Sequence, residues 1–202
     1  MKRVLECPGV FPQHGRLLGR LLGRLRAAGR CGKTAAAVVA SALVALSACS
    51  PALNWRDVRP EGAAIQMQFP CKPNGQSRDL SLAGKRVNLA LHACAAGGMM
   101  WGLAVADVAD PALVGPALSQ LATSAAVNLG TVAGETLPLR VSGATPNEAA
   151  GRRRLTGKLP DGQAVQMQMA VFTRGTLVYQ ASVLGERVTD EAAQTFFDAV
   201  RL

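Results

Sequence analysis

Hydrophobic and polar residues alternate along several stretches of the chain, as they do in β-strands that bury one face. In Ile65-Gln66-Met67-Gln68-Phe69 the three apolar side chains would share a face, and Pro70 and Pro73 would end the strand. Turn residues such as those of Pro160-Asp161-Gly162 separate consecutive stretches and predict antiparallel hairpins. The same pattern predicts further strands over 86–94, 99–108, 137–141, 152–159, 164–172 and 177–183.

Two other stretches have the spacing of helices. Asp110 and Pro111 predict the start of the first, because Asp caps a helix and Pro suits its first position, and Gly130 indicates its end. Thr189 predicts the cap of a second helix that is rich in apolar residues on one side. The order strands, helix, strands, helix predicts an α+β fold, an antiparallel sheet of about six to seven strands with two helices packed on it.

The most apolar stretch of the chain, 34–48, follows a run rich in arginine. Its 15 residues are too few for a membrane span, which needs about 20, and they are typical of an export signal. The stretch leads into Leu46-Ser47-Ala48-Cys49, which resembles the bacterial lipobox, where a signal peptidase cuts before a lipidated cysteine. We therefore expect a signal peptide over 1–48, a lipidated Cys49 with a short tether over 49–54, and a single α+β domain over 55–202.

An ordinary secretory cleavage, for example after Ser47, is the alternative, and it would leave Cys49 as a free thiol in an oxidising compartment. Ser50, rather than Asp, follows the cysteine, and by resemblance to the usual sorting rule this indicates the outer membrane. Lipidation would also explain why Cys49 is the odd cysteine.

The net charge of +9 does not predict a nucleic-acid partner. Residues 1–48 hold eight of the 22 basic residues and one of the 13 acidic ones, so residues 49–202 carry only +2. The cysteines divide in the same way. Cys7 and Cys31 leave with the leader, and Cys71 and Cys94 remain at strand ends, where we expect a disulfide. The 22 residues between them are unlike a redox-active Cys-x-x-Cys pair.

No residue of the predicted domain has the context of a catalytic or metal site, and we expect no cofactor. His92 is its only histidine and lacks a nucleophile motif around it. The methionines could suit copper(I), but they alternate with apolar residues as core residues do. In the strand over 152–159, Arg152 and Arg154 would point to one side and Arg153 to the other. This triplet predicts either a charged edge strand or a contact with anionic lipid or an acidic partner.

Two short motifs carry a resemblance to a known group. Phe69-Pro70-Cys71-Lys72-Pro73, the helix in mid-chain and Phe196-Phe197-Asp198-Ala199-Val200-Arg201-Leu202 resemble small Gram-negative lipoproteins of unassigned function. The layout is also similar to the PsbP-like fold, whose members share an FP-x-x-P first strand and a similar terminal helix. The resemblance implies roles in binding and assembly, and none of its functional residues maps onto this chain.

The sequence therefore predicts an outer-membrane lipoprotein whose domain faces the periplasm, held to the membrane by lipid on Cys49. Its expected role is that of a non-catalytic binding or assembly accessory for another envelope component. A carrier of a small ligand or metal is the alternative, and an enzyme that uses His92 as its base is a second alternative.

Overall fold

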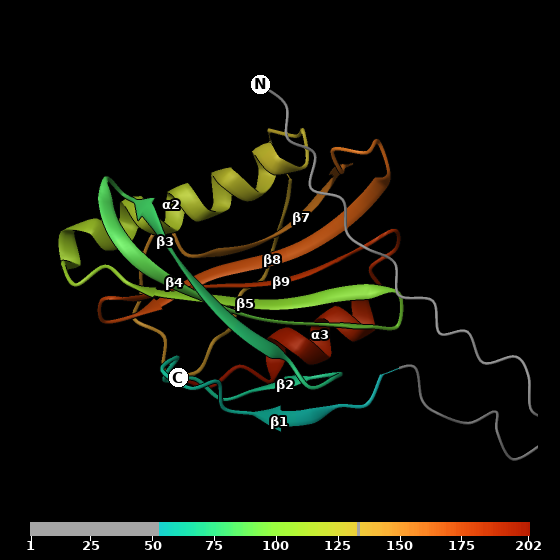
Figure 1. Cartoon of the computed structure of the whole chain (residues 1–202), viewed down its shortest axis with the longest axis horizontal. Coiled ribbons are helices and arrows are strands. Elements are labelled where there is room, and N and C mark those ends of the chain that lie inside the picture. Colours follow the sequence, from blue (N-terminus) through green and yellow to red (C-terminus); the bar gives the residue numbers. More distant parts are fainter. Residues whose placement is uncertain (1–52, 133) are drawn as a thin grey trace, which may run out of the picture. The chain divides into compact units, whose positions relative to one another are not determined.

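The computed structural model describes residues 53–202 apart from residue 133 (Figure 1). The predicted signal peptide, the lipobox residues Leu46-Ser47-Ala48, Cys49 and the start of the tether lie outside the described residues. None of the described helices is long and apolar enough to cross a membrane.

Seven antiparallel strands form the main sheet, in the order β3-β4-β5-β9-β8-β7-β6. Strands β3 to β5 form one meander and β6 to β9 form another, and the two meanders join where β5 pairs with β9. The antiparallel α+β architecture expected from the sequence is confirmed. The strands are β3 (Asn74–Leu82), β4 (Lys85–Ala96), β5 (Met99–Asp107), β6 (Glu135–Leu137), β7 (Gly151–Lys158), β8 (Ala164–Arg174) and β9 (Leu177–Gly185).

A second, two-stranded sheet pairs β1 (Arg56–Val58) with β2 (Met67–Phe69). The strand predicted over 65–69 is therefore confirmed for Met67–Phe69, but it pairs with β1 outside the main sheet. Gln66, directly before β2, pairs with Arg201 near the end of the described residues, and the two exchange backbone hydrogen bonds of 2.9 and 2.8 Å. On its other side Arg201 forms a parallel bridge with Ser142.

Two sequence predictions need correction at the sheet edges. Strand β3 was not predicted, because its side chains are almost all exposed and polar and show no alternation; it pairs with β4 from Asn74↔Ala93 to Leu82↔Lys85. The strand predicted over 137–141 is wrong beyond Leu137, where β6 ends. Pro138 follows directly, and a proline has no N–H to continue the hydrogen-bond ladder.

The two helices cover opposite faces of the main sheet, so the domain has three layers (Figure 1). Helix α2 (Pro111–Asn128) packs on one face, and Asp110 caps it as predicted, accepting a 2.9 Å bond from the N–H of Ala112. Helix α3 (Asp190–Asp198) and the small sheet cover the other face. Thr189 stands at the predicted cap position, but its side chain makes no capping hydrogen bond.

Aromatic rings fill the layer on the α3 side. The ring of Phe196 lies 5.3 Å from that of Phe69 and 5.3 Å from that of Trp101, both edge to face. On the α2 side the contacts are aliphatic and small, including buried Ala117 and Ala125. Met67 and Met99 lie in the core on the α3 side and Met169 lies in the core on the α2 side, as their alternation with apolar residues predicts.

The end of α2 lies directly against β7. The N–H of Lys158 donates to the carbonyl of Leu129 over 3.0 Å. A Cβ atom added to Gly157 would come within 2.0 Å of that same carbonyl oxygen, so the close approach requires glycine. Gly151, at the other end of β7, has open space around it.

We expect Gly157→Ala to lower the free energy of unfolding by about 1–3 kcal/mol, because the added methyl group must push the helix end away from the strand. Gly151→Ala is the matched control and should leave stability unchanged or raise it slightly. Urea unfolding of both variants checks this. Equal effects at the two positions would contradict the close fit of Leu129 on β7.

Candidate functional site

The two cysteines of the domain form the predicted disulfide. Cys71, just after β2, is bonded to Cys94 in β4, and their Cα atoms are 6.0 Å apart. Cys94 is buried in the core on the α3 side, and Cys71 packs against the same core. The bond therefore fastens the small sheet to the main sheet.

The arginine triplet lies on β7, with its three side chains in different environments. Arg152 is 6% exposed, Arg154 is half-buried and Arg153 is exposed. Arg152 and Arg154 both contact residues of α3, so their predicted orientation to one side is confirmed. The interpretation as a charged edge strand is wrong, because the three residues of β6 pair with all three arginines and β6 forms the edge.

A polar network joins Arg152 and Arg154 to the start of α3. Arg154 donates to Glu135 over 2.6 Å and also forms an ion pair with Asp190. Gln168 donates to Asp190 over 2.8 Å and accepts from Arg152 over 2.7 Å. The hydrogen bonds from Arg154 and then Gln168 hold the pKa of Asp190 below its ordinary value. The network thus keeps Asp190 charged and fixes α3 to β7 and β8.

Arg152 is a buried cation with unused donors. Its guanidinium carbon lies 4.2 Å from the centre of the Phe197 ring, a cation–π contact. Within the described residues Gln168 is its one hydrogen-bond acceptor, and the buried Nε has none. Burial lowers the pKa of Arg152, and the nearby carboxylates of Asp198 and Asp190 oppose that shift. An arginine stays protonated despite this, so an incompletely paired charge is held between the sheet and α3.

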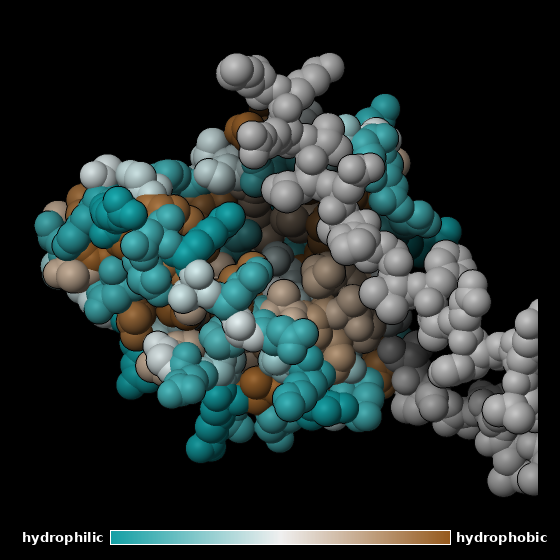
Figure 2. All heavy atoms as spheres, in the orientation of Figure 1, coloured by the Kyte–Doolittle hydropathy of each residue, from teal (hydrophilic) through white to brown (hydrophobic). Residues whose placement is uncertain are grey.

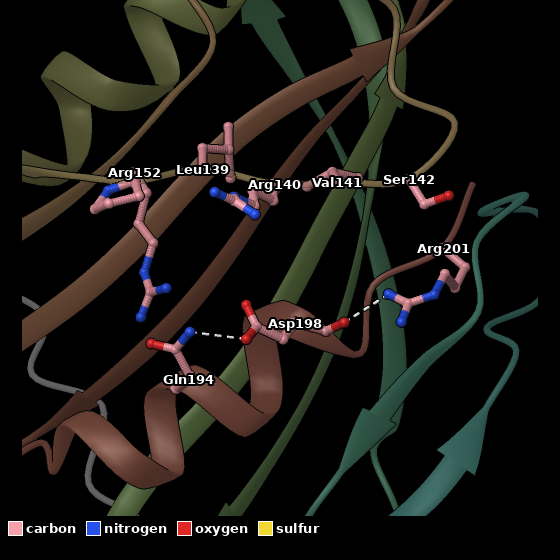
Figure 3. Close-up of a pocket in the computed structure, with 9 residues that line it drawn as sticks. Leu139, Arg140, Val141, Ser142, Arg152, Gln194, Asp198 and Arg201 are labelled. Atoms are coloured by element: carbon pink, nitrogen blue, oxygen red, sulfur yellow. Dashed lines mark hydrogen bonds between the residues drawn. The ribbon is translucent and has the colours of Figure 1, made fainter.

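A pocket of about 870 Å³ opens beside this arginine. The segment 138–142 and Arg152 form one wall, and α3 with the residues after it forms the other (Figure 3). Its polar lining residues are Arg140, Ser142, Arg152, Gln194, Asp198 and Arg201, and Pro138, Leu139 and Val141 contribute apolar surface.

Positive charge dominates the lining of this pocket, which we call the arginine pocket. Arg201 donates to the backbone carbonyls of Asp198 and Val200 over 2.5 and 2.7 Å, and not to a carboxylate. The Asp198 carboxylate accepts from Gln194 over 2.8 Å. Neither Arg140, Arg152 nor Arg201 forms an ion pair with any described residue. Three guanidinium groups and one carboxylate therefore line the arginine pocket.

His92 lies apart from the arginine pocket, on β4. It faces the α3 side of the sheet, and a Cβ at Gly75 on the neighbouring strand would come within 3.2 Å of its Nδ1. Its Nε2 is buried without a hydrogen-bond partner among the described residues, and burial lowers its pKa. Over residues 53–202 without 133, no group of three or more His, Cys, Asp or Glu side chains is placed to hold a metal ion.

A second hollow of about 830 Å³ lies at the β4–β5 hairpin and is lined mainly by apolar and small residues, including half-exposed Met100. Figure 2 shows that apolar patches interrupt the polar surface on one face of the domain. The chemistry available at the two hollows differs. The arginine pocket can bind anions, and this second hollow offers only apolar contact and peptide groups beside Gln163 and Glu186.

No protein-family model matches this chain, and neither a curated protein nor a solved structure matches it. The resemblance to Gram-negative lipoproteins and the PsbP-like fold therefore stays a prediction. Sequence reasoning identified Arg152 but missed Arg140, Gln194, Asp198 and Arg201 as its neighbours. These neighbours could be identified only from the proximity of residues 138–142 to α3, and no spacing in the sequence indicates that proximity.

We expect Cys71→Ser combined with Cys94→Ser to lower the free energy of unfolding by about 3 kcal/mol, because the unfolded chain gains the freedom of an open loop. Urea unfolding with and without reductant checks this. Reductant should bring the wild-type protein to the stability of the double variant and leave the variant unaffected. A wild-type protein indifferent to reductant would show that the bond does not constrain the chain.

We expect the burial of His92 to lower the free energy of unfolding as the pH falls from neutral. Its folded pKa lies below the ordinary 6.5, so the unfolded chain takes up the proton first. This destabilising contribution is absent above the unfolded pKa and grows as the pH falls from the unfolded pKa towards the folded pKa. His92→Gln should therefore show a smaller loss of unfolding free energy between about pH 7.5 and about pH 5. If the wild-type protein and His92→Gln lose the same unfolding free energy over this pH range, burial of His92 is not the cause of the pH dependence.

Proposed function

We propose that the protein is a lipoprotein of the Gram-negative outer membrane, lipidated on Cys49, whose periplasmic domain is a non-catalytic binding or assembly accessory. The Cys71–Cys94 disulfide is the observation that carries this proposal. Structural disulfides persist in oxidising compartments such as the periplasm and are rare in the cytosol. The lipobox-like Leu46-Ser47-Ala48-Cys49 is typical of proteins exported to that compartment.

The anchor follows from the cysteines that remain. With Cys71 and Cys94 bonded to each other, Cys49 is the one further cysteine in the sequence after the predicted signal peptide. Lipidation gives it a role, and several acyl chains together hold a protein on a membrane far more firmly than one. The few residues between Cys49 and Trp55 would keep the domain close to the bilayer.

Binding is favoured over catalysis by the contents of the arginine pocket. Its cations and its single carboxylate can hold a charged group. The hydrogen bonds described within its lining run from Gln194 and Arg201 to Asp198 and Val200, and none of them pairs a base with a nucleophile as hydrolytic catalysis requires. His92 lies on a different strand from the pocket residues, with its Nε2 buried.

A small-ligand carrier is the second candidate, and the volume of the arginine pocket favours it. Sites for small molecules commonly enclose about 300–1,000 Å³, and this pocket measures about 870 Å³. A methionine-based metal carrier has less support. Met67 and Met169 belong to cores on opposite sides of the sheet and do not converge.

The intact mass of the chain from the membrane fraction of a Gram-negative host tests the proposal. We expect residues 49–202 plus lipid, with two alkylatable thiols that appear only after reduction. Cys49→Ala should give an unlipidated chain, and Cys31→Ala, a matched substitution in the leader, should be processed normally. A soluble, unlipidated wild-type chain with a free Cys49 thiol would overturn the proposed anchor and compartment.

A further inference from the structure

The lining of the arginine pocket carries two more positive charges than negative ones. Arg140, Arg152 and Arg201 contribute three guanidinium groups, and Asp198 contributes one carboxylate. Side chains of like charge repel one another when they share a hollow in a medium of low dielectric constant. Because no described carboxylate forms an ion pair with these arginines, the imbalance calls for a ligand with about two negative charges.

Arg152 is already held in position for such a ligand. The Phe197 ring and the oxygen of Gln168 fix its guanidinium in a site where the residue is 6% exposed. Its Nε has no hydrogen-bond partner among the residues described. A buried charge with unpaired donors is costly, and an anion in the pocket would reduce that cost. The loss of side-chain freedom on binding is also small for a guanidinium that is already fixed.

The other lining residues describe the rest of the ligand. Leu139 and Val141 offer apolar contact, and the volume of about 870 Å³ is far larger than a bare inorganic anion needs. The Asp198 carboxylate, which accepts from Gln194, can also accept a hydrogen bond from a hydroxyl group. A small organic molecule with hydroxyl groups and one dianionic group fits this combination.

We propose that the arginine pocket binds a phosphate monoester carried by a small hydroxylated organic molecule, either free or as a phospholipid headgroup that ends in such a monoester. Phosphate has the oxygens to accept paired hydrogen bonds from more than one guanidinium fork. Its monoester carries close to two negative charges at neutral pH, which matches the lining. This assignment goes beyond the proposed function and does not depend on export or lipidation.

Calorimetry on the purified full chain in a neutral detergent tests the proposal with three soluble probes. These are glycerol 3-phosphate, inorganic phosphate and glycerate, which replaces the phosphate with a carboxylate. We expect glycerol 3-phosphate to bind more tightly than either of the others. Vesicles of phosphatidic acid, whose headgroup is a phosphate monoester, and of phosphatidylcholine form the second arm, in which binding to the first only would identify a lipid headgroup as the source.

Arg140→Gln and Arg201→Gln should each weaken binding of the responding probe by about tenfold or more, as expected for the loss of a hydrogen bond to a charged group. Arg153→Gln is the matched control. It removes the same charge from an exposed arginine on the same strand as Arg152 but outside the pocket lining, and it should change the affinity by less than about twofold.

Arg152→Met tests the buried arginine, because methionine keeps much of the contact with Phe197 without a charge. Its circular dichroism and unfolding curve show whether it folds. A folded Arg152→Met that binds the probe as tightly as wild type would overturn the role of Arg152. The whole proposal fails if neither glycerol 3-phosphate nor the anionic vesicles bind, if glycerate binds best, or if Arg153→Gln weakens binding as much as Arg140→Gln does.

Discussion

The pairing of β5 with β9 holds the two halves of this domain together. One meander precedes α2 and the other follows it, and their main-chain connection within the sheet is the ladder from Met99↔Gly185 to Asp107↔Leu177. Both strands are buried on both faces over much of their length. The ladder therefore needs cover on each side, and the two helices lie on opposite faces of the sheet for that reason.

The two layers that cover the sheet are built differently. Small and aliphatic side chains fill the α2 layer, which leaves little room for polar chemistry. The α3 layer combines aromatic rings with the network around Arg154 and Asp190, and it also contains the disulfide. All three of the buried side-chain atoms without a partner among the described residues, on His92, Arg152 and Tyr179, lie on this side as well. Buried polar groups without partners are uncommon in proteins, so the α3 layer is where binding chemistry is to be sought.

The sequence predicted the features that depend on local pattern or on cysteine chemistry. Alternation located most strands of the main sheet, Asp110 and Pro111 located the start of α2, and two cysteines in one domain with an expected export signal predicted their bond. The sequence did not predict the strands and pocket residues whose placement depends on the tertiary structure. Strand β3 has polar side chains because it lies at an edge, and β6 stops at Pro138. The arginine pocket depends on a loop that ends at Ser142 and a helix that begins at Asp190, so the sequence indicated Arg152 without its neighbours.

The backbone bridge at Arg201 has a consequence for access to the pocket. Gln66, Arg201 and Ser142 lie side by side, and Leu202 adds a 3.0 Å hydrogen bond to the carbonyl of Ser142. Both Arg201 and Ser142 belong to the pocket lining. A wider opening on that side requires these main-chain hydrogen bonds to break. The entry rate of a bulky molecule through the bridged side would therefore follow the frequency of local unfolding, which is slower than the motion of exposed side chains.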